Sequence, residues 1–320
     1  MQNNYEGCRD TQTEEQKSLN YKLIEVCSAP QPVSWIEKTN YKSYPIRDQD
    51  GSCQCVTMTL ATEMGIIAEQ KYGTFIDFSS CFPYQQRKYT SFKGCTSEDL
   101  FEVFPKIGNI LEILMPSQKI GENACMAVPK LSYYDDLAKV FKIKRIALPL
   151  DFETVASTVQ ATGKGVSVWF KFDHTEWTNK PQVLVSNPTG GHSVTVVDFA
   201  LINGKKYLVI QDSWGISFAV RGLRFISEEY FKARCYQASY LLSFSMQTEQ
   251  GVRPTYISRS VSSAKDCFKW EGLFPTNIES NNVADNIYKT AVKSFQKRFG
   301  LTSDGIVGPI TRQKLLELYK

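Results

Sequence analysis

Histidine is scarce in this chain: His174 and His192 are the only two among 320 residues. Any mechanism in which an imidazole accepts a proton must therefore use one of them. Long apolar runs are also absent, since no stretch approaches the roughly 18 residues that a membrane-spanning helix needs. We expect no membrane span, and a globular chain with 42% apolar residues and room for two or three domains.

Strong net charge is lacking as well. Lys and Arg number 37 and Asp and Glu number 33, which gives a formal charge of +4. Such a small charge does not indicate a nucleic-acid partner and fits only weak attraction to an anionic surface. The first five residues lack the basic-then-apolar pattern of a signal peptide. Either the protein stays inside the cell or a signal has been removed.

Cysteine, in contrast, is plentiful, with nine residues. An odd number fits one reactive thiol plus up to four disulfides, which indicates an oxidising compartment and hence secretion. The alternative is a cytosolic protein with nine buried, reduced cysteines. Metal binding is not expected, because Cys53 and Cys55 are separated by a single residue and no second close pair follows. The pairing of four cysteines stays open: Cys8, Cys27, Cys235 and Cys267.

Cys55 is the candidate catalytic nucleophile. Apolar residues recur at steps of three and four from Val56 onward, which predicts a helix over residues 55–70. Ser52 is its expected N-cap. Cys55 would then lie in the first turn, where the helix dipole and the unpaired N–H groups favour a thiolate. The alternatives are Cys53 as the nucleophile, or Cys55 as a buried helix residue without a chemical role.

A thiol that attacks an acyl carbon also needs a base and a group that orients the base. We assign His192 as the base and Asp212 as the orienting residue. Two apolar runs flank Asn203-Gly204, a pair typical of tight hairpin turns. His192 and Asp212 are therefore expected at the same end of two neighbouring strands. The alternative is a core role for His192, with His174 as the base.

The donors for the oxyanion are the remaining part of the site. Gln49 lies six residues before Cys55, and its side-chain amide together with the Cys55 backbone N–H would hold the oxyanion. Trp214 is expected to shield the hydrogen bond between His192 and Asp212 from water. The alternatives are a solvated loop amide for Gln49, a surface-paired carboxylate for Asp212 and plain core packing for Trp214.

These residues resemble the papain family of cysteine peptidases, and the match runs from about Val33 to Ser245. The family's glutamine lies six residues before its cysteine, and residues 212–215 read Asp-Ser-Trp-Gly where the family has Asn-Ser-Trp-Gly. The resemblance implies a two-lobed α+β fold. A helical left lobe would carry Cys55, and a β-barrel-like right lobe would carry His192. It also implies two disulfides in the left lobe, Cys53–Cys95 and Cys81–Cys125.

The sequence departs from the family pattern in several places. Asp212 replaces the family's Asn, and its charge would raise the pKa of His192 and favour an ion pair with the thiolate. Val56 replaces the aromatic residue that usually follows the nucleophile. Thr96-Ser97 stand in place of the Gly-Gly wall that pairs with the substrate backbone. The departures therefore affect the expected substrate subsites more than the chemistry.

Residues 255–320 read as a small all-α domain. Asp285 can cap a helix over residues 286–299, and Pro309 can open a final helix. The loop over residues 304–311 reads Asp-Gly-x-x-Gly-Pro-x-Thr and resembles bacterial peptidoglycan-binding domains of the three-helix kind. The resemblance implies a bacterium or its phage, and the cell envelope. Glycan binding, docking against the catalytic domain or another protein, and simple stabilisation are the roles considered for it.

The sequence thus predicts four segments: a lead-in over residues 1–32, a papain-like catalytic domain over 33–246, a linker over 247–254 and a peptidoglycan-binding-like domain over 255–320. We expect a monomeric cysteine endopeptidase, secreted or at the cell envelope, whose signal peptide has been removed. It would hydrolyse protein or peptide substrates through a Cys-His-Asp triad and an acyl-enzyme thioester. No metal or organic cofactor is expected.

Three other functions fit parts of the sequence. A hydrolase of peptidoglycan stem peptides would use the same triad. Acyl transfer of the transglutaminase kind shares the order Cys, His, Asp, although the spacing of Gln49 from Cys55 counts against it. A wall-binding or adhesion protein with a degenerate peptidase lobe needs no chemistry at all.

Overall fold

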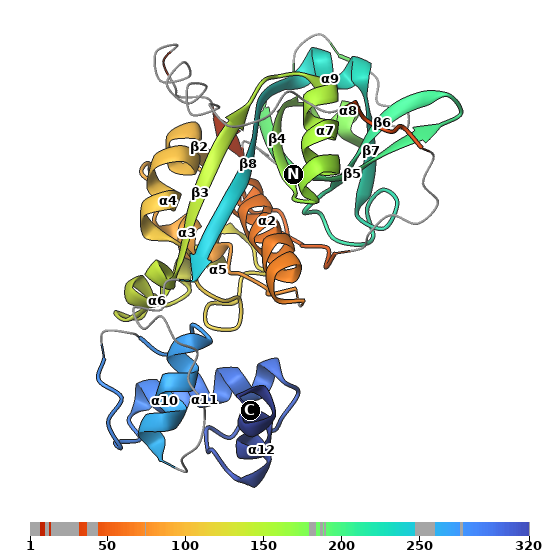
Figure 1. The fold of residues 1–320 in the computed structure, drawn as a ribbon. Helices are drawn as coiled ribbons and strands as arrows, with labels where there is room; N and C mark the ends of the chain where they lie inside the picture. Colours follow the sequence, from red (N-terminus) through yellow and green to blue (C-terminus); the bar gives the residue numbers. More distant parts are fainter. Residues whose placement is uncertain are drawn as a thin grey trace.

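The protein consists of a larger body of helices and strands and a smaller helical body (Figure 1). The computed structural model describes residues 7–9, 13, 32–36, 44–73, 75–178, 184–185, 188, 190–246, 260–275 and 278–319. Helices and an antiparallel sheet both occur, so the predicted α+β class is confirmed. Across the described residues, the structure contains no helix with the length and apolar character needed to cross a membrane.

The helices of the larger body are short apart from α2, Cys55–Tyr72, and α7, Phe152–Thr162. Helix α2 carries the candidate nucleophile at its first residue. The short helices of the same lobe also precede the sheet in sequence: α3 Cys81–Gln85, the π-helix η1 Asp99–Val103, α4 Phe104–Ile107, α5 Glu122–Ala127 and α6 Tyr134–Val140. Two further short helices join strands of the second lobe: α8 His174–Thr178 and α9 Glu228–Arg234.

A six-stranded sheet forms the second lobe, with neighbouring strands antiparallel in the order β3-β8-β4-β5-β6-β7. The strands are β3 Phe141–Leu148, β4 Val166–Phe172, β5 Gly190–Ile202, β6 Lys205–Gln211, β7 Leu223–Ser227 and β8 Cys235–Met246. The turn between β5 and β6 places Asn203 at φ 50° and Gly204 at φ 74°. Positive φ at both residues suits the twist of a hairpin, so the predicted Asn-Gly hairpin is confirmed.

Helices α7 and α9 pack against this sheet over a core of aromatic and aliphatic side chains. The rings of Phe152 on α7 and Phe231 on α9 meet edge to face, with centroids 5.7 Å apart. Asp151 caps α7, because its carboxylate accepts the N–H of Thr154 at 2.7 Å. The core holds the sheet rigid where β5 and β6 carry the candidate base and its orienting residue.

Helix α2 is the centre of the larger body (Figure 1). Every residue from Cys55 to Ala68 is buried, and the helix packs against β5, β8 and β4. Packing on all sides therefore holds this threonine-containing helix together where propensity alone would not. The predicted helix is confirmed, but its predicted cap is wrong: Ser52 accepts a hydrogen bond from the Gln54 amide at 2.9 Å, and α2 has no side-chain cap.

A buried ion pair joins α2 to the sheet. The Arg145 guanidinium on β3 contacts the Glu63 carboxylate on α2, and both side chains are almost fully buried. Arg145 also donates to the Ser239 hydroxyl at 2.9 Å, and the Ser167 N–H donates to Glu63 at 3.2 Å. The helical lobe and the sheet are thus linked by charge-assisted hydrogen bonds as well as by apolar contacts.

The smaller body contains three helices, α10 Val261–Trp270, α11 Asn286–Arg298 and α12 Pro309–Leu318. Asp285 caps α11, as predicted, by accepting the N–H of Tyr288 at 2.7 Å. The loop before α12 is tied to α11, because the Gln296 amide donates to Asp304 at 2.7 Å. The Asp-Gly-x-x-Gly-Pro-x-Thr stretch therefore serves as the joint between the last two helices.

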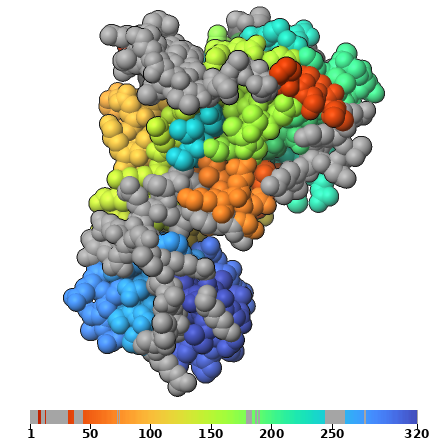
Figure 2. All heavy atoms as spheres, in the orientation of Figure 1, coloured from red at the N-terminus to blue at the C-terminus, as the bar shows by residue number. Residues whose placement is uncertain are grey.

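This helical body contacts the larger body near α6 and β3, and it forms the lower lobe of the surface in Figure 2. A Cβ atom on Gly272 would lie 2.5 Å from the ring of Phe141, so a larger residue would push the two bodies apart. A groove of about 910 Å³ runs along the junction, lined by residues such as Glu112, Trp270 and Arg298.

Candidate active site

The thiol of Cys55 lies at the first residue of α2 and is fully buried. The first-turn N–H groups of a helix lack partners inside the helix, and the helix dipole favours negative charge there. The thiol hydrogen bonds with the side chain of His192, and the backbone N–H of Ser193 points at it as well. The position of Cys55 thus agrees with the prediction from sequence, and its surroundings favour a thiolate.

The β5–β6 hairpin brings His192 and Asp212 together. In the hairpin Thr195 pairs with Gln211, and an irregularity between Val196 and Asp198 shifts the register by one residue. The Nε2 atom of His192 lies 2.8 Å from an Asp212 carboxylate oxygen. The imidazole therefore lies between the Cys55 thiol and the Asp212 carboxylate, in the order that the sequence predicts.

Asp212 has two partners that the sequence analysis missed, Arg224 and Trp177. The second carboxylate oxygen accepts the Arg224 Nε–H at 2.7 Å and the Trp177 indole N–H at 2.8 Å. The Ser213 N–H donates to the first oxygen at 2.8 Å. A signal for Arg224 was present, since it is a charged residue inside the apolar strand 223–226, and such a charge requires a buried partner. Nothing local marks Trp177.

The charges of these groups depend on one another. Burial opposes ionisation of Cys55, but hydrogen bonds from Cys8 and His192 and the charge of His192 lower its pKa to about 5. Burial also opposes a charged His192, but Asp212 and Cys55 raise its pKa to about 9. The pKa of Asp212 is held well below its usual range by His192 and Arg224, despite burial. At neutral pH the site therefore contains a thiolate, an imidazolium and a carboxylate.

Three aromatic rings enclose His192. The Trp177 ring stands nearly perpendicular to the imidazole at 5.2 Å, Phe172 lies at 5.4 Å and Trp214 at 5.6 Å between centroids. The Arg224 guanidinium lies over both indoles, 5.2 Å from Trp177 and 5.4 Å from Trp214. Rings in these positions fit the predicted shielding of the bond between His192 and Asp212 from water, and that role of Trp214 stays a prediction.

Gln49 is buried beside the same strand end. The side-chain amide oxygen of Gln49 accepts a hydrogen bond from the Ser213 hydroxyl at 2.5 Å. The Gln49 backbone N–H donates to the Ser213 backbone carbonyl at 2.9 Å. One amide hydrogen is used by the Ser52 carbonyl within the loop before α2. An amide has two N–H donors, so one hydrogen is left for an oxyanion. The oxyanion role of Gln49 stays a prediction.

His174, the alternative base, lies at the start of α8. Its ring meets the ring of Trp214 at 5.7 Å, on the outer side of the aromatic group that encloses His192. The contacts to Cys55 and Asp212 both belong to His192. The geometry therefore favours His192 over His174 as the candidate base.

Part of the predicted lead-in lies inside the site. β1, Cys8–Arg9, pairs in parallel with β2, Cys95–Thr96, so that Cys8 faces Cys95. The Gly7 N–H donates to the Gly191 carbonyl at 3.1 Å. A Cβ atom on Gly7 would lie 2.2 Å from the Cys55 sulfur, so Gly7 lies directly on the thiol. Most of residues 1–32 lies outside the described part of the chain, and sequence reasoning gave no sign of this contact.

The predicted disulfides are not formed in the structure, which carries all four cysteines as thiols: Cys53, Cys95, Cys81 and Cys125. The Cys81 and Cys125 side chains do share a hydrogen bond, so a disulfide between them stays a prediction. Cys95 has Cys8 as its backbone neighbour, which gives it a second candidate partner besides Cys53. Cys27 lies outside the described residues.

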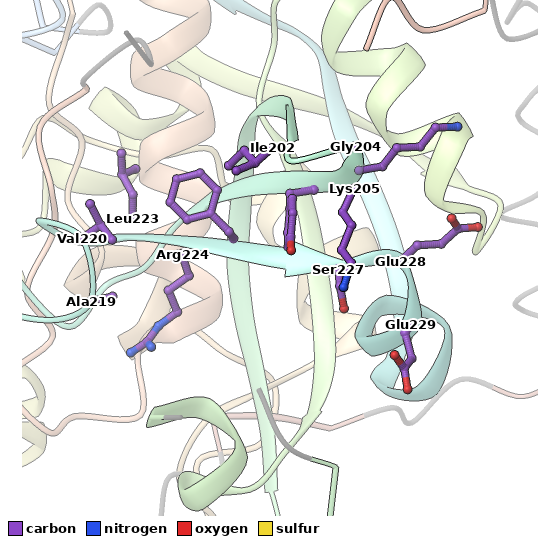
Figure 3. Close-up of a pocket in the computed structure, with 13 residues that line it drawn as sticks. Ile202, Gly204, Lys205, Ala219, Val220, Leu223, Arg224, Ser227, Glu228 and Glu229 are labelled. Atoms are coloured by element: carbon purple, nitrogen blue, oxygen red, sulfur yellow. The ribbon is translucent and has the colours of Figure 1, made fainter. Parts of the chain in front are cut away.

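A second pocket, of about 900 Å³, lies elsewhere on the sheet lobe (Figure 3). It is lined by residues of β6, β7, the adjoining turns and the start of α9, among them Lys205, Glu228 and Glu229, and it also includes Arg224, the partner of Asp212. The candidate nucleophile and base do not line it. Among the described residues, no group of three or more His, Cys, Asp or Glu side chains is arranged to hold a metal ion.

Solved structures of cysteine proteases are similar to this chain in fold. Procathepsin L 3 from the Tenebrio molitor larval midgut aligns with a TM-score of 0.52 at 16% identity, over 68% of this chain and 72% of that chain. Xylellain, a cysteine protease from Xylella fastidiosa, aligns with a TM-score of 0.52 at 16% identity, over 67% and 86%. The fold is papain-like. The two-lobed fold expected from the sequence is therefore confirmed.

Relatives extend the papain-like comparison. Cathepsin S of Mus musculus is 25% identical over 219 residues, which is 64% of this chain and 61% of cathepsin S. The papain-like chain thus spans less than two thirds of that relative's length. The cysteine protease and lectin-like domains of Cwp84, a surface layer associated protein of Clostridium difficile, align with a TM-score of 0.53 at 16% identity, over 68% of this chain and 55% of that chain.

The helical body has a match of its own. A family model described as a putative peptidoglycan binding domain matches residues 260–315. These residues include α10, α11 and most of α12. A papain-like fold is thus followed by a helical body that matches a peptidoglycan-binding family, the resemblance that the sequence predicts.

Proposed function

We propose that this protein is a cysteine endopeptidase that hydrolyses peptide bonds through Cys55, His192 and Asp212. One observation carries the proposal: the His192 imidazole contacts both the Cys55 thiol and the Asp212 carboxylate within a papain-like fold. A nucleophile, a base and an orienting residue in hydrogen-bond contact are what acyl transfer by a thiol requires. The low pKa of Cys55, about 5, and the high pKa of His192, about 9, support a ready-made ion pair.

In the proposed reaction, the Cys55 thiolate attacks the carbonyl carbon of the scissile peptide bond. The Cys55 N–H and the second amide hydrogen of Gln49 stabilise the oxyanion. The His192 imidazolium gives its proton to the leaving amine and then accepts one from water, which attacks the thioester and releases the acid. Asp212 stabilises the imidazolium throughout, and Arg224 with Trp177 fixes the carboxylate in place.

The test is hydrolysis of a protein substrate such as casein by the full chain in reducing buffer. Cys55→Ala is expected to abolish hydrolysis, since among the described cysteines Cys55 is the one that contacts His192 from a helix N-terminus. Cys235→Ala is the matched control, because the Cys235 thiol on β8 hydrogen bonds with backbone groups of Gln237 and Trp169 rather than with the candidate base. Full activity in Cys55→Ala with the fold intact would refute the proposal.

The C-terminal domain favours a narrower candidate, hydrolysis of the peptide stems of peptidoglycan at the cell envelope. Its support is the match of residues 260–315 to a peptidoglycan-binding family, together with the surface-layer association of Cwp84. Release of soluble fragments from purified sacculi, with casein left untouched, would establish it. Binding to sacculi without any cleavage, and no reaction of Cys55 with an epoxide probe at neutral pH, would indicate a non-catalytic wall-binding protein.

A further inference from the structure

We propose that Cys8 and Cys55 form a reversible disulfide that closes the candidate active site, so that a thiol reductant opens it. The inference rests on the proposed function only in taking Cys55 as the nucleophile. The bond itself depends on the geometry of the two cysteines and can be tested without any assay of activity.

The backbone of residues 7–9 is held over Cys55 from two sides. On one side the Cys95 N–H donates to the Gly7 carbonyl at 3.0 Å, next to the β1–β2 pairing. On the other side the Gly7 N–H donates to the Gly191 carbonyl, one residue before His192. Cys8 therefore has a fixed backbone position between the helical lobe and the sheet lobe.

Two glycines make this approach possible. A Cβ atom on Gly7 would overlap the Cys55 sulfur, as noted above. A Cβ atom on Gly191 would lie 2.3 Å from the Cys8 carbonyl oxygen and 3.0 Å from the Cys8 sulfur. Side chains at either position would move the segment away from Cys55. The two glycines thus allow residues 7–9 to lie in close contact with Cys55 and with the start of β5.

The Cys8 side chain points at the nucleophile. Its thiol hydrogen bonds with the side chain of Cys55 and lies 3.0 Å from the Tyr236 hydroxyl. Cys8 is buried, which raises its pKa, whereas the pKa of Cys55 is lowered to about 5. A low-pKa thiolate next to a protonated thiol is the arrangement in which one sulfur attacks a disulfide and the other resolves it.

The oxidant is a small-molecule disulfide, RSSR. The Cys55 thiolate attacks one sulfur of RSSR, which forms a Cys55–SR mixed disulfide and releases RS⁻. Cys8 then loses its proton and attacks the Cys55 sulfur, which forms the Cys8–Cys55 bond and releases a second RS⁻. Two protein thiols are oxidised and one RSSR is reduced to two RSH. A reductant reverses the reaction, with Cys55 as the better leaving group because of its lower pKa.

Cys95 is the competing partner, since it faces Cys8 across β1 and β2. A Cys8–Cys95 bond would anchor the segment but leave the Cys55 sulfur able to react. The Cys8 thiol hydrogen bonds with Cys55 and Tyr236, whereas Cys95 acts on it through charge alone, which favours the Cys8–Cys55 bond. The two bonds join different peptides, so mass spectrometry separates them.

The experiment treats the full chain with oxidised glutathione, blocks the remaining thiols with N-ethylmaleimide in acid and maps the linked peptides by mass spectrometry without reduction. We expect a Cys8–Cys55 link, together with at least tenfold slower epoxide labelling of Cys55 that dithiothreitol reverses. Cys8→Ser should leave Cys55 as a stable glutathione adduct. Gly7→Ala should also lose the link, because the added methyl group displaces the segment, and Cys95→Ser should keep it.

A Cys8–Cys95 link, or an unlinked Cys55–glutathione adduct in the unaltered protein, would overturn the inference. Comparison with hydrolysis separates it from the proposed function. If the Cys8–Cys55 link forms but the reduced protein stays inactive, the proposed peptidase function is contradicted and the proposed disulfide is not. Hydrolysis by the reduced protein without a link after oxidation contradicts the bond and not the peptidase.

Discussion

Glu63 and Asp212 are buried carboxylates that each contact an arginine, but their pKa values shift in opposite directions. Glu63 on α2 contacts Arg145, and burial raises its pKa more than Arg145 lowers it. Asp212 at the end of β6 contacts Arg224, and its pKa is lowered although burial opposes this. A buried ion pair alone therefore does not mark a chemical site.

The number and kind of hydrogen-bond donors make the difference. Glu63 accepts from the Arg145 guanidinium and one backbone N–H, that of Ser167. Asp212 accepts from His192, Arg224, an indole N–H and a backbone N–H. Each donor to the charged form lowers the pKa. Glu63 therefore links the helical lobe to the sheet through Arg145. Asp212 stays ionised and raises the pKa of His192.

The largest effect is expected at the structural pair. Glu63→Gln leaves the buried Arg145 guanidinium without a counter-charge, and removing one partner of a buried ion pair costs about 3–5 kcal/mol. The free energy of unfolding, from urea titration of the reduced protein, should fall by that amount. Replacing both residues, Glu63→Leu with Arg145→Met, should recover most of the loss, since the charge that needs a partner is gone.

An exposed ion pair is the control for this prediction. Lys232 and Glu228 lie one turn apart on the surface of α9. Glu228→Gln should change the free energy of unfolding far less than Glu63→Gln, because water screens the exposed pair. Equal losses in the two variants would show that the Glu63–Arg145 pair does not hold the lobes together.

The sequence predicted the parts of the site that local patterns specify. Cys55 was placed by a helical repeat, and the Asn203-Gly204 turn placed His192 and Asp212 at one end of a hairpin. Both signals arise because a few consecutive residues determine a helix or a tight turn. Ser52 was wrongly expected to cap α2, because the same serine is used by the Gln54 amide nearby.

The parts that the sequence did not reveal depend on contacts between distant residues. Arg224 reaches Asp212 only because β6 and β7 pair. Cys8 lies beside Cys55 because its strand pairs with Cys95, which is distant in sequence. A strand of two residues is too short to show a periodic pattern. Such pairings are fixed by tertiary packing, which periodicity and turn residues do not encode.

A smaller effect, seen mainly in the pH dependence, is expected at Arg224. Arg224→Met removes a positive charge near His192 and leaves the Asp212 charge less compensated, and both changes raise the pKa of His192. The basic limb of the kcat/KM profile, which reflects loss of the His192 proton, should therefore move above pH 9. Activity at neutral pH should fall, because a more stable imidazolium gives up its proton less readily.

Arg234→Met is the control for Arg224, since Arg234 contacts Glu176 rather than Asp212. It should leave the basic limb where it is in the unaltered protein. If Arg224 only stabilises the fold, Arg224→Met should lower the activity without moving the basic limb of the kcat/KM profile. The position of the limb, rather than the rate, therefore decides whether Arg224 positions Asp212.

Asp212→Asn should produce the smallest change in rate and a shift of the pH profile in the opposite direction, and it should also lower the free energy of unfolding, because it leaves the buried Arg224 guanidinium without a counter-charge. Asparagine can still accept the hydrogen bond of His192, and it is the residue that the papain family carries here, so activity should persist. Without the negative charge the pKa of His192 falls below 9, whereas Cys55 still ionises beside a protonated His192, so its pKa should not rise above 5. The bell-shaped profile should therefore narrow from its basic side. Cys8 also lowers the pKa of Cys55, so the acidic limb is best compared in variants that carry Cys8→Ser. An unchanged width would mean that the Asp212 charge, unlike its hydrogen bond, does not affect the reacting pair.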